Sequence, residues 1–379
     1  MDTFPEPAGN MHRLKLCRSG NYGCGCSRNN RCRHDNNRVN RRERNSNGKM
    51  RTSNLNRLLR HTAPHRFLLL CLPFTASCSE GLIYYDAPQA APKLFALTIR
   101  HSDASSVLET VEEYPEENSS SAGVFGRVLA DVVRKYPSDS YGLIFASHGS
   151  GWLPCGALSD PTRTIGDDRT PGTTGGAREM EITDFAAAIP DHQFDFIIFE
   201  ACLMSGIEVA YELRNKTDYL LASSAELLVP GYAPVYPTAF QYLFDTSLGV
   251  PQALEKFAGS YFNYIDTRNG AYRSATQSIV YTREMDALAI LAGKTTGNTH
   301  GRWDDALLGK LQHFDRPGSY GDIPARPRYF DFGQYMAYLA PERQADLDAL
   351  LRKTVVWKAA TPEFMAGYNG FTILTHSGL

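Results

Sequence analysis

From Leu82 onward, short apolar runs alternate with segments of helical periodicity. Six apolar runs have the length of buried strands: residues 82–86, 94–99, 141–147, 194–199, 219–223 and 277–281. Apolar positions recur at helical spacing in 124–136, and shorter helical segments are expected at 182–189 and 203–213. Strands that alternate with helices predict a parallel sheet with helices on both faces, so the fold class is α/β.

Two polar stretches interrupt this pattern. Residues 112–121 are polar and predict a loop. Residues 149–180 are rich in Gly, Pro, Thr and Asp and predict a much longer one. A loop of that length inside a domain usually carries function. After residue 237 the pattern is mostly helical, apart from the run at 277–281.

Residues 1–80 have a different character, and residues 1–66 are rich in Asn and Arg without hydrophobic periodicity. An Arg-rich arm could neutralise phosphates, but no aromatic residues interleave with the arginines. A zinc knuckle would need paired spacing, which is missing from the set Cys17, Cys24, Cys26, Cys32 and His34. We therefore interpret residues 1–80 as a disordered or non-native extension.

A possible export signal lies within this extension, over residues 50–78. Basic residues precede the apolar run 67–74, and small residues follow before Cys78. This order is typical of a bacterial export signal, and Cys78 resembles the lipid-modified cysteine of a lipobox. The pattern predicts a secreted protein or a cell-envelope lipoprotein, with a lipid anchor at Cys78 and the start at Met50. The alternative is a chance apolar stretch.

Charge and cysteine content narrow the function classes. Lys and Arg number 39 against 41 Asp and Glu, so nucleic acid or a membrane surface is not expected as the main partner. No apolar run is long enough for a spanning helix. Six of the eight cysteines precede residue 80, and only Cys155 and Cys202 follow. The regular part of the chain is therefore not a disulfide framework.

Reactive side chains follow two of the predicted strands. His148 comes after the strand at 141–147, and Cys202 after the strand at 194–199, 54 residues later. Loops at the carboxyl ends of parallel strands build the site in such sheets. An imidazole beside a thiol can take its proton and release a nucleophilic thiolate. The pair therefore favours nucleophilic catalysis, whereas no serine lies in a G-x-S-x-G motif.

The backbone around the pair suggests an oxyanion hole. We expect Cys202 at the start of a helix, whose N-terminus would favour the thiolate and whose N–H groups could bind an oxyanion. Gly149 has no side chain, so its N–H could approach a substrate carbonyl as a second donor. The predicted donors are the backbone N–H groups of Gly149 and Cys202.

Two sequence blocks resemble the signatures of clostripain-like cysteine peptidases. They are YGLIFASHGSGW at 141–152 and FDFIIFEACLMSGIEVAYEL at 194–213, and the segments 82–88, 165–168, 180–182 and 218–226 also fit. The resemblance covers residues 81–379. It implies a three-layer, caspase-like α/β fold with a mainly parallel sheet, a His148/Cys202 dyad, and cleavage of protein or peptide substrates after Arg or Lys. It also implies a Gram-negative bacterium as the source of the secreted protein or cell-envelope lipoprotein, and we expect a monomer.

The resemblance also implies self-cleavage in the loop after His148. Arg163 lies nearest the expected position, and Arg169 and Arg178 are further candidates. Some family members depend on Ca²⁺, for which Asp167 and Asp168 could be ligands, although acids in a loop are usually just solvated. Apart from that calcium, we predict no metal and no cofactor.

The chain departs from the family pattern in two ways. Glu200 stands two residues before Cys202, where the family usually has Asp, and we take Glu200 and Glu226 as candidates for binding a basic P1 side chain. A first strand and helix are not found before Leu82, and the chain ends at Leu379 where the family continues. The second reading is therefore an inactive or fragmentary homologue that acts as a non-enzymatic binding module.

Overall fold

The computed structural model describes eleven segments of the chain: residues 50–51, 68–71, 79–87, 90–99, 106–153, 165–166, 168, 179–296, 305–315, 328–364 and 368–374. All of them belong to one unit, residues 48–379. Several residues with predicted roles lie outside these segments: residues 1–49, the proposed lipid anchor Cys78, and the candidate cleavage residues Arg163, Arg169 and Arg178. Within them, no helix has the length and apolarity needed to cross a bilayer.

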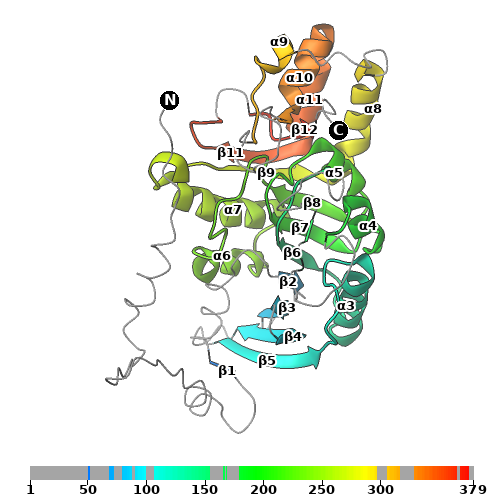
Figure 1. Cartoon of the computed structure of the whole chain (residues 1–379), viewed down its shortest axis with the longest axis vertical. Helices are drawn as coiled ribbons and strands as arrows, with labels where there is room; N and C mark the ends of the chain where they lie inside the picture. Colours follow the sequence, from blue (N-terminus) through cyan, green and yellow to red (C-terminus); the bar gives the residue numbers. More distant parts are fainter. Residues whose placement is uncertain are drawn as a thin grey trace, which may run out of the picture. The chain divides into compact units, whose positions relative to one another are not determined.

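A ten-stranded sheet organises this unit (Figure 1). Its order is β1 (Met50–Arg51), β5 (Ser106–Glu113), β4 (Ala90–Ile99), β3 (Ser79–Ala87), β2 (Leu68–Cys71), β6 (Gly142–Ala146), β7 (Phe194–Glu200), β8 (Thr217–Ala222), β9 (Thr276–Tyr281) and β11 (Val355–Ala360). Strands β6, β7 and β8 are parallel, and the other pairings are antiparallel. The predicted α/β class is confirmed, with parallel pairing confined to the centre of the sheet.

Helices lie on both faces of the sheet, and a small second sheet stands beside it. The helices are α3 (Ala122–Lys135), α4 (Ile182–Ala187), α5 (Ile207–Glu212), α6 (Tyr236–Leu243), α7 (Val250–Asp266), α8 (Met285–Thr296), α9 (Asp305–Leu308), α10 (Phe332–Leu339) and α11 (Gln344–Thr354), with short 3-10 turns at Gly270–Tyr272, Thr282–Glu284 and Pro341–Arg343. Strands β10 (Tyr329–Asp331) and β12 (Thr372–Leu374) form the second sheet.

The alternation of side chains along each central strand creates two cores. Phe145 and Phe199 face one side and pack with Phe185 of α4 and Phe125 of α3, whose ring centroids lie 4.9 Å apart. Neighbouring positions face the other side, against α6 and α7 (Figure 1). Because both faces of β6 and β7 are covered, their sequences are continuous apolar runs, which is why they could be recognised from sequence.

The antiparallel half of the sheet differs from the sequence-based prediction. Residues 106–113 form strand β5, although 112–113 was expected to be loop; this outer strand mixes polar and apolar residues and so lacks a buried strand's pattern. The sequence pattern also predicts no strand before Leu82. In the structure, however, Leu68–Cys71 forms strand β2, which pairs with β3 on one side and with β6 on the other. The apolar run assigned to an export signal thus supplies an interior strand.

Candidate active site

The register of the two central strands brings His148 and Cys202 to the same edge of the sheet. In the parallel ladder Ala146 pairs with Glu200, and the Ser147 N–H donates to the Glu200 carbonyl at 3.2 Å. His148 and Cys202 each come two positions after the paired residues. The loops that carry them therefore leave adjacent strands at matching positions, as the sequence predicted.

Two glycines allow these loops to touch. A Cβ atom on Gly149 would lie 2.8 Å from the Cys202 carbonyl oxygen and 2.8 Å from Met204 Sδ. Gly151 has φ +62°, and a Cβ there would lie 2.6 Å from the Leu203 carbonyl oxygen. Only glycine permits this approach. The backbone next to His148 thus packs directly on the backbone at and after Cys202.

Cys202 does not begin a helix, which corrects the sequence-based expectation. It lies in a turn, and α5 starts only at Ile207 with Gly206 as its N-cap. The Leu203 N–H donates to the Ala225 carbonyl at 3.1 Å, and the Ser205 N–H to the Ser223 carbonyl at 3.0 Å. These contacts with the segment after β8 commit the backbone away from helix. Support for a thiolate from a helix N-terminus is therefore not part of this site.

Leu203, the residue after the cysteine, has φ +61°. Leucine rarely adopts this left-handed conformation, and such backbone outliers gather at functional sites. The sharp turn leaves Cys202 partly exposed, whereas Leu203 is buried. Cys202 is not in a disulfide; its thiol lies 3.9 Å from the Leu227 carbonyl oxygen, and its Sγ accepts a hydrogen bond from the Leu227 N–H at 3.2 Å. Hydrogen bonds to the charged form of a group favour that form, so this contact supports a thiolate.

Glu200 lies at the end of β7 in a network with the segment that leads into α6. Its carboxylate accepts the Tyr232 N–H at 2.6 Å and a hydrogen bond from the Tyr236 hydroxyl. Burial raises the pKa of Glu200 to about 7, although both hydrogen bonds oppose that rise. Gly231, with φ +62°, lies against the carboxylate, because a Cβ there would come within 2.2 Å of Oε1.

Glu226 is partly buried and lies on the segment beside the nucleophile turn. Its neighbours are Ala225, whose carbonyl accepts the Leu203 N–H, and Leu227, whose N–H contacts the Cys202 thiol. The two predicted acids therefore lie on two segments that meet at the nucleophile turn: Glu200 at the end of β7 and Glu226 in the connection after β8. Sequence reasoning did not identify Tyr232 and Tyr236 as partners of Glu200, or Leu227 as a partner of Cys202.

The described parts of the loop after His148 are held together by isolated β-bridges. Gly149 bridges Ile165, and Ile165 bridges Met180. The Gly166 N–H donates to the His148 carbonyl at 3.2 Å. These contacts anchor the backbone of His148 and Gly149 to residues 165–166. Arg163, Arg169 and Arg178 fall outside the described residues.

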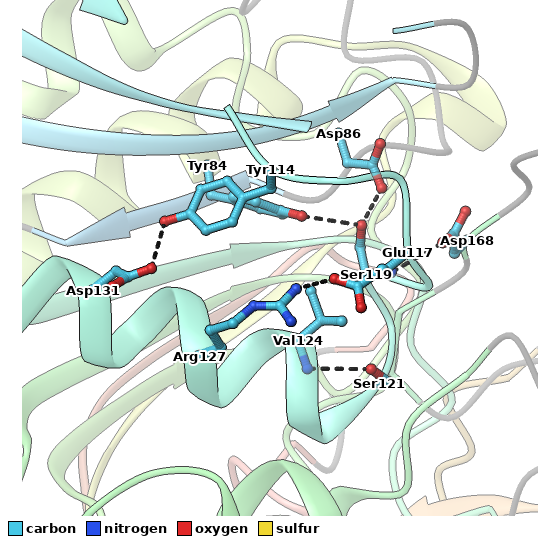
Figure 2. Close-up of polar contacts among 10 residues, drawn as sticks. All are labelled: Tyr84, Asp86, Tyr114, Glu117, Ser119, Ser121, Val124, Arg127, Asp131 and Asp168. Atoms are coloured by element: carbon cyan, nitrogen blue, oxygen red, sulfur yellow. Dashed lines mark hydrogen bonds and ion pairs between the residues drawn. The ribbon is translucent and has the colours of Figure 1, made fainter. Parts of the chain in front are cut away.

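Asp168 belongs to a buried polar cluster above α3 (Figure 2). Its carboxylate accepts the Ser119 N–H at 3.0 Å, while the Ser119 hydroxyl donates to Asp86. Tyr84 reaches the same hydroxyl, with 3.4 Å between the two oxygens. Among the described residues, no group of three or more His, Cys, Asp or Glu side chains could hold a metal ion. Asp167 lies outside those residues, so the calcium ligands stay a prediction.

Comparison with known proteins agrees with this geometry. The model of the clostripain family matches residues 79–291, more than half of the chain. Clostripain from Hathewaya histolytica is 26% identical over 227 residues, which are 55% of this chain and 40% of that protein. The chain therefore spans about two fifths of the length of this curated relative.

Two solved structures share the fold. An inactive zymogen of a C11 protease from Parabacteroides distasonis is 29% identical, with a TM-score of 0.60 over 77% of this chain and 80% of its own. A secreted C11 cysteine protease from Bacteroides thetaiotaomicron, in complex with an irreversible peptide inhibitor, is 24% identical. Its TM-score is 0.61, and the match covers 79% of this chain and 82% of that protein's chain. The fold seen here is thus that of the C11 proteases, and the chain belongs to the clostripain family.

Proposed function

We propose that this chain is a cysteine endopeptidase in which Cys202 is the nucleophile and His148 the general base. The observation that carries the proposal is the matching register of the two residues on adjacent parallel strands, with Gly149 packed on the Cys202 carbonyl. The family match and the C11 proteases among its structural relatives support the same chemistry.

The reaction would proceed by acyl transfer through the thiol. The His148 imidazole accepts the proton from Cys202, and the thiolate attacks the carbonyl carbon of the scissile peptide. The carbon–nitrogen bond then breaks, and the imidazolium gives its proton to the departing amine. Water, deprotonated by the same imidazole, hydrolyses the thioester and frees the thiol. The Leu227 N–H would hold the thiolate, and the N–H groups of Gly149 and Cys202 would hold the oxyanion.

Glu200 and Glu226 are the groups we propose for recognition of Arg or Lys at P1. Glu200 suits this role because it is two residues from the nucleophile and its carboxylate is held by a backbone N–H and a phenol. A bound guanidinium or ammonium would favour the ionised form of an acid whose pKa burial has raised. Glu200→Gln should therefore lower kcat/KM for peptides with Arg at P1 more than it lowers thiol reactivity.

Activation is proposed to occur by cleavage after Arg163. Ile165 and Gly166, just downstream, are tied to Gly149 and His148, so a cut there would leave the flanking backbone attached to the site. Mass spectrometry of the purified protein should find a new N-terminus at Thr164. That fragment should be missing from Cys202→Ala protein and from Arg163→Ala protein. Cleavage at Thr164 in Cys202→Ala protein alone in solution would contradict self-processing.

Export is a separate proposal, in which the protein is secreted or held at the cell envelope by a lipid on Cys78 and acts as a monomer on peptide substrates. It rests on the sequence pattern at 50–78 and on a structural relative described as secreted. Removal of a signal ending before Cys78 would also remove Leu68–Cys71, which here is strand β2. N-terminal sequencing and a lipid-labelling assay of protein from a Gram-negative host would decide between the two uses of that segment.

The decisive test compares two fluorogenic peptides, one with Arg and one with Asp at P1. Wild type and Cys202→Ala should be assayed beside a partly exposed control remote in sequence from the dyad, Ser260→Ala. We expect cleavage after Arg that is lost only in Cys202→Ala. Cleavage by Cys202→Ala at the wild-type rate would refute the dyad. No cleavage by folded wild type, before or after trypsin nicking of the loop, would instead identify a non-enzymatic binding module.

A further inference from the structure

The small sheet made of β10 and β12, called the ribbon below, contacts both catalytic loops. Tyr329 pairs with Leu374 and Asp331 with Thr372, so the two strands run antiparallel. Its residues are remote in sequence from the proposed dyad, by more than 120 positions from Cys202. The ribbon is nonetheless the place where the chain after residue 328 returns to the candidate active site.

On the histidine side, the ribbon contacts the loop through Tyr329. The Tyr329 hydroxyl donates a hydrogen bond to the carbonyl of Ser150, two residues after His148. Tyr329 is 4% exposed and Ser150 is 0% exposed, so no bulk water competes for this bond. The next residue, Gly151, lies so close to the ring that a Cβ on it would be 3.5 Å from Tyr329 Cε1.

On the cysteine side, the ribbon pairs with the end of the nucleophile turn. The Thr372 N–H donates to the Ser205 carbonyl at 2.9 Å, and Gly206 bridges Thr372 in parallel register. The Ser205 hydroxyl donates to the Gly370 carbonyl at 2.8 Å. Farther along, the Leu374 N–H donates to Glu208 of α5 at 3.2 Å. The turn that presents Cys202 is thus bonded to β12 through backbone and side chain.

The ribbon is itself held in place by a buried carboxylate. Asp331, which is 0% exposed, accepts the N–H of Asn369 and the Asn369 side-chain amide, both at 2.7 Å. It also caps α10 by accepting the Gln334 N–H at 2.9 Å. The Phe332 N–H donates to the Phe371 carbonyl at 3.1 Å. These bonds fasten the start of α10 to the segment that enters β12.

We propose that the ribbon is a brace that fixes the distance between the His148 and Cys202 loops, with Tyr329 as the positioning residue on the histidine side. The inference rests on the proposed dyad. Both loops leave the main sheet at their catalytic residues, and beyond that point their backbones are irregular. Proton transfer within the dyad depends steeply on the separation of the two side chains. A rigid element bonded to both loops removes their freedom to drift apart.

Tyr329→Phe tests the brace because it removes one oxygen and keeps the ring in the core. The matched control is Tyr338→Phe, on the exposed face of α10. We expect kcat/KM for an Arg peptide to fall about tenfold, mostly through kcat. The acidic limb of the pH profile for alkylation of Cys202 by iodoacetamide should move to higher pH, because a looser imidazolium stabilises the thiolate less.

A second variant checks the other end of the brace. Ser205→Ala removes the hydroxyl bonds to Gly370, just before β12, and to Ser278 of β9. Its alkylation profile should move in the same direction as that of Tyr329→Phe. A purely structural role would lower the melting temperature and leave the pH profile unmoved, which would overturn the proposal. So would wild-type values of kcat/KM in both variants. Activity in Cys202→Ala would instead overturn the dyad, and the two failures are distinct.

Discussion

Replacing Glu200 by Gln tests whether its carboxylate is held in a desolvated site. Burial raises the pKa of Glu200 from 4.5 to about 7, so the folded protein binds this proton more tightly than the unfolded chain does. The stabilising contribution of the group is therefore complete below about pH 4.5 and is lost as pH rises through about 7. Gln cannot ionise, so the variant lacks this loss.

The magnitude follows from the shift. Each pKa unit corresponds to about 1.4 kcal/mol, and between pH 5 and pH 8 the wild type should lose about 2.5 kcal/mol of unfolding free energy through this one group. Because Glu200 is partly exposed as a residue, this figure is an upper value. The unfolding free energy of Glu200→Gln minus that of the wild type should thus rise by up to about 2.5 kcal/mol from pH 5 to pH 8.

Urea unfolding at both pH values, in a Cys202→Ala background that prevents self-digestion, measures this difference. The pKa of Glu208 is also raised to about 7 by burial, but Glu208 is present in both proteins and cancels. Exposed Glu255→Gln is the control, and its difference from wild type should be the same at pH 5 and pH 8. If the difference in unfolding free energy between Glu200→Gln and wild type is also the same at pH 5 and pH 8, the reasoning is refuted, whatever the size of that difference.

Three glycine substitutions give further predictions. Gly231→Ala should destabilise the protein by about 1–3 kcal/mol, because its φ is +62° and the new Cβ would displace the Glu200 carboxylate. Gly259→Ala in α7, where the new Cβ would meet open space, should instead stabilise the protein by about 0.5–1 kcal/mol. Thermal unfolding of both variants measures these changes. Gly149→Ala should abolish peptide cleavage while the protein remains folded, because its Cβ would push against the Cys202 carbonyl; wild-type kcat/KM would contradict the packing of the two loops.

Sequence reasoning located the parallel centre of the fold because its strands are buried on both faces. The run at 194–199 and its neighbour at 141–147 needed no tertiary information, and their ends led to Cys202 and His148. The error at Cys202 has a different origin. The predicted helix begins at Ile207 and not at Leu203, because the N–H groups of Leu203 and Ser205 bond to carbonyls after β8. Local periodicity does not reveal such a distant acceptor.

The companions of the site were missed for the same reason. Tyr236 donates to Glu200 from 36 residues away, and Tyr329 donates to Ser150 from 179 residues away. Neither tyrosine stands in a motif, and each looks like an ordinary core aromatic in the sequence. Their roles depend on where the fold places a single hydroxyl, which only a three-dimensional structure shows.

The order of the strands also bears on how the chain folds. Strands β3, β4 and β5 follow one another in the chain, so their paired residues are close in sequence: Ser79 and Ile99, which join β3 to β4, are 20 residues apart. By contrast, Gly142 of β6 pairs with Phe196 of β7, and Tyr219 of β8 pairs with Tyr281 of β9, at separations of 54 and 62 residues. Closing longer loops costs more entropy and slows folding. The strands β3 to β5 should therefore form first, and the candidate active site should assemble later, when β6 pairs with β7.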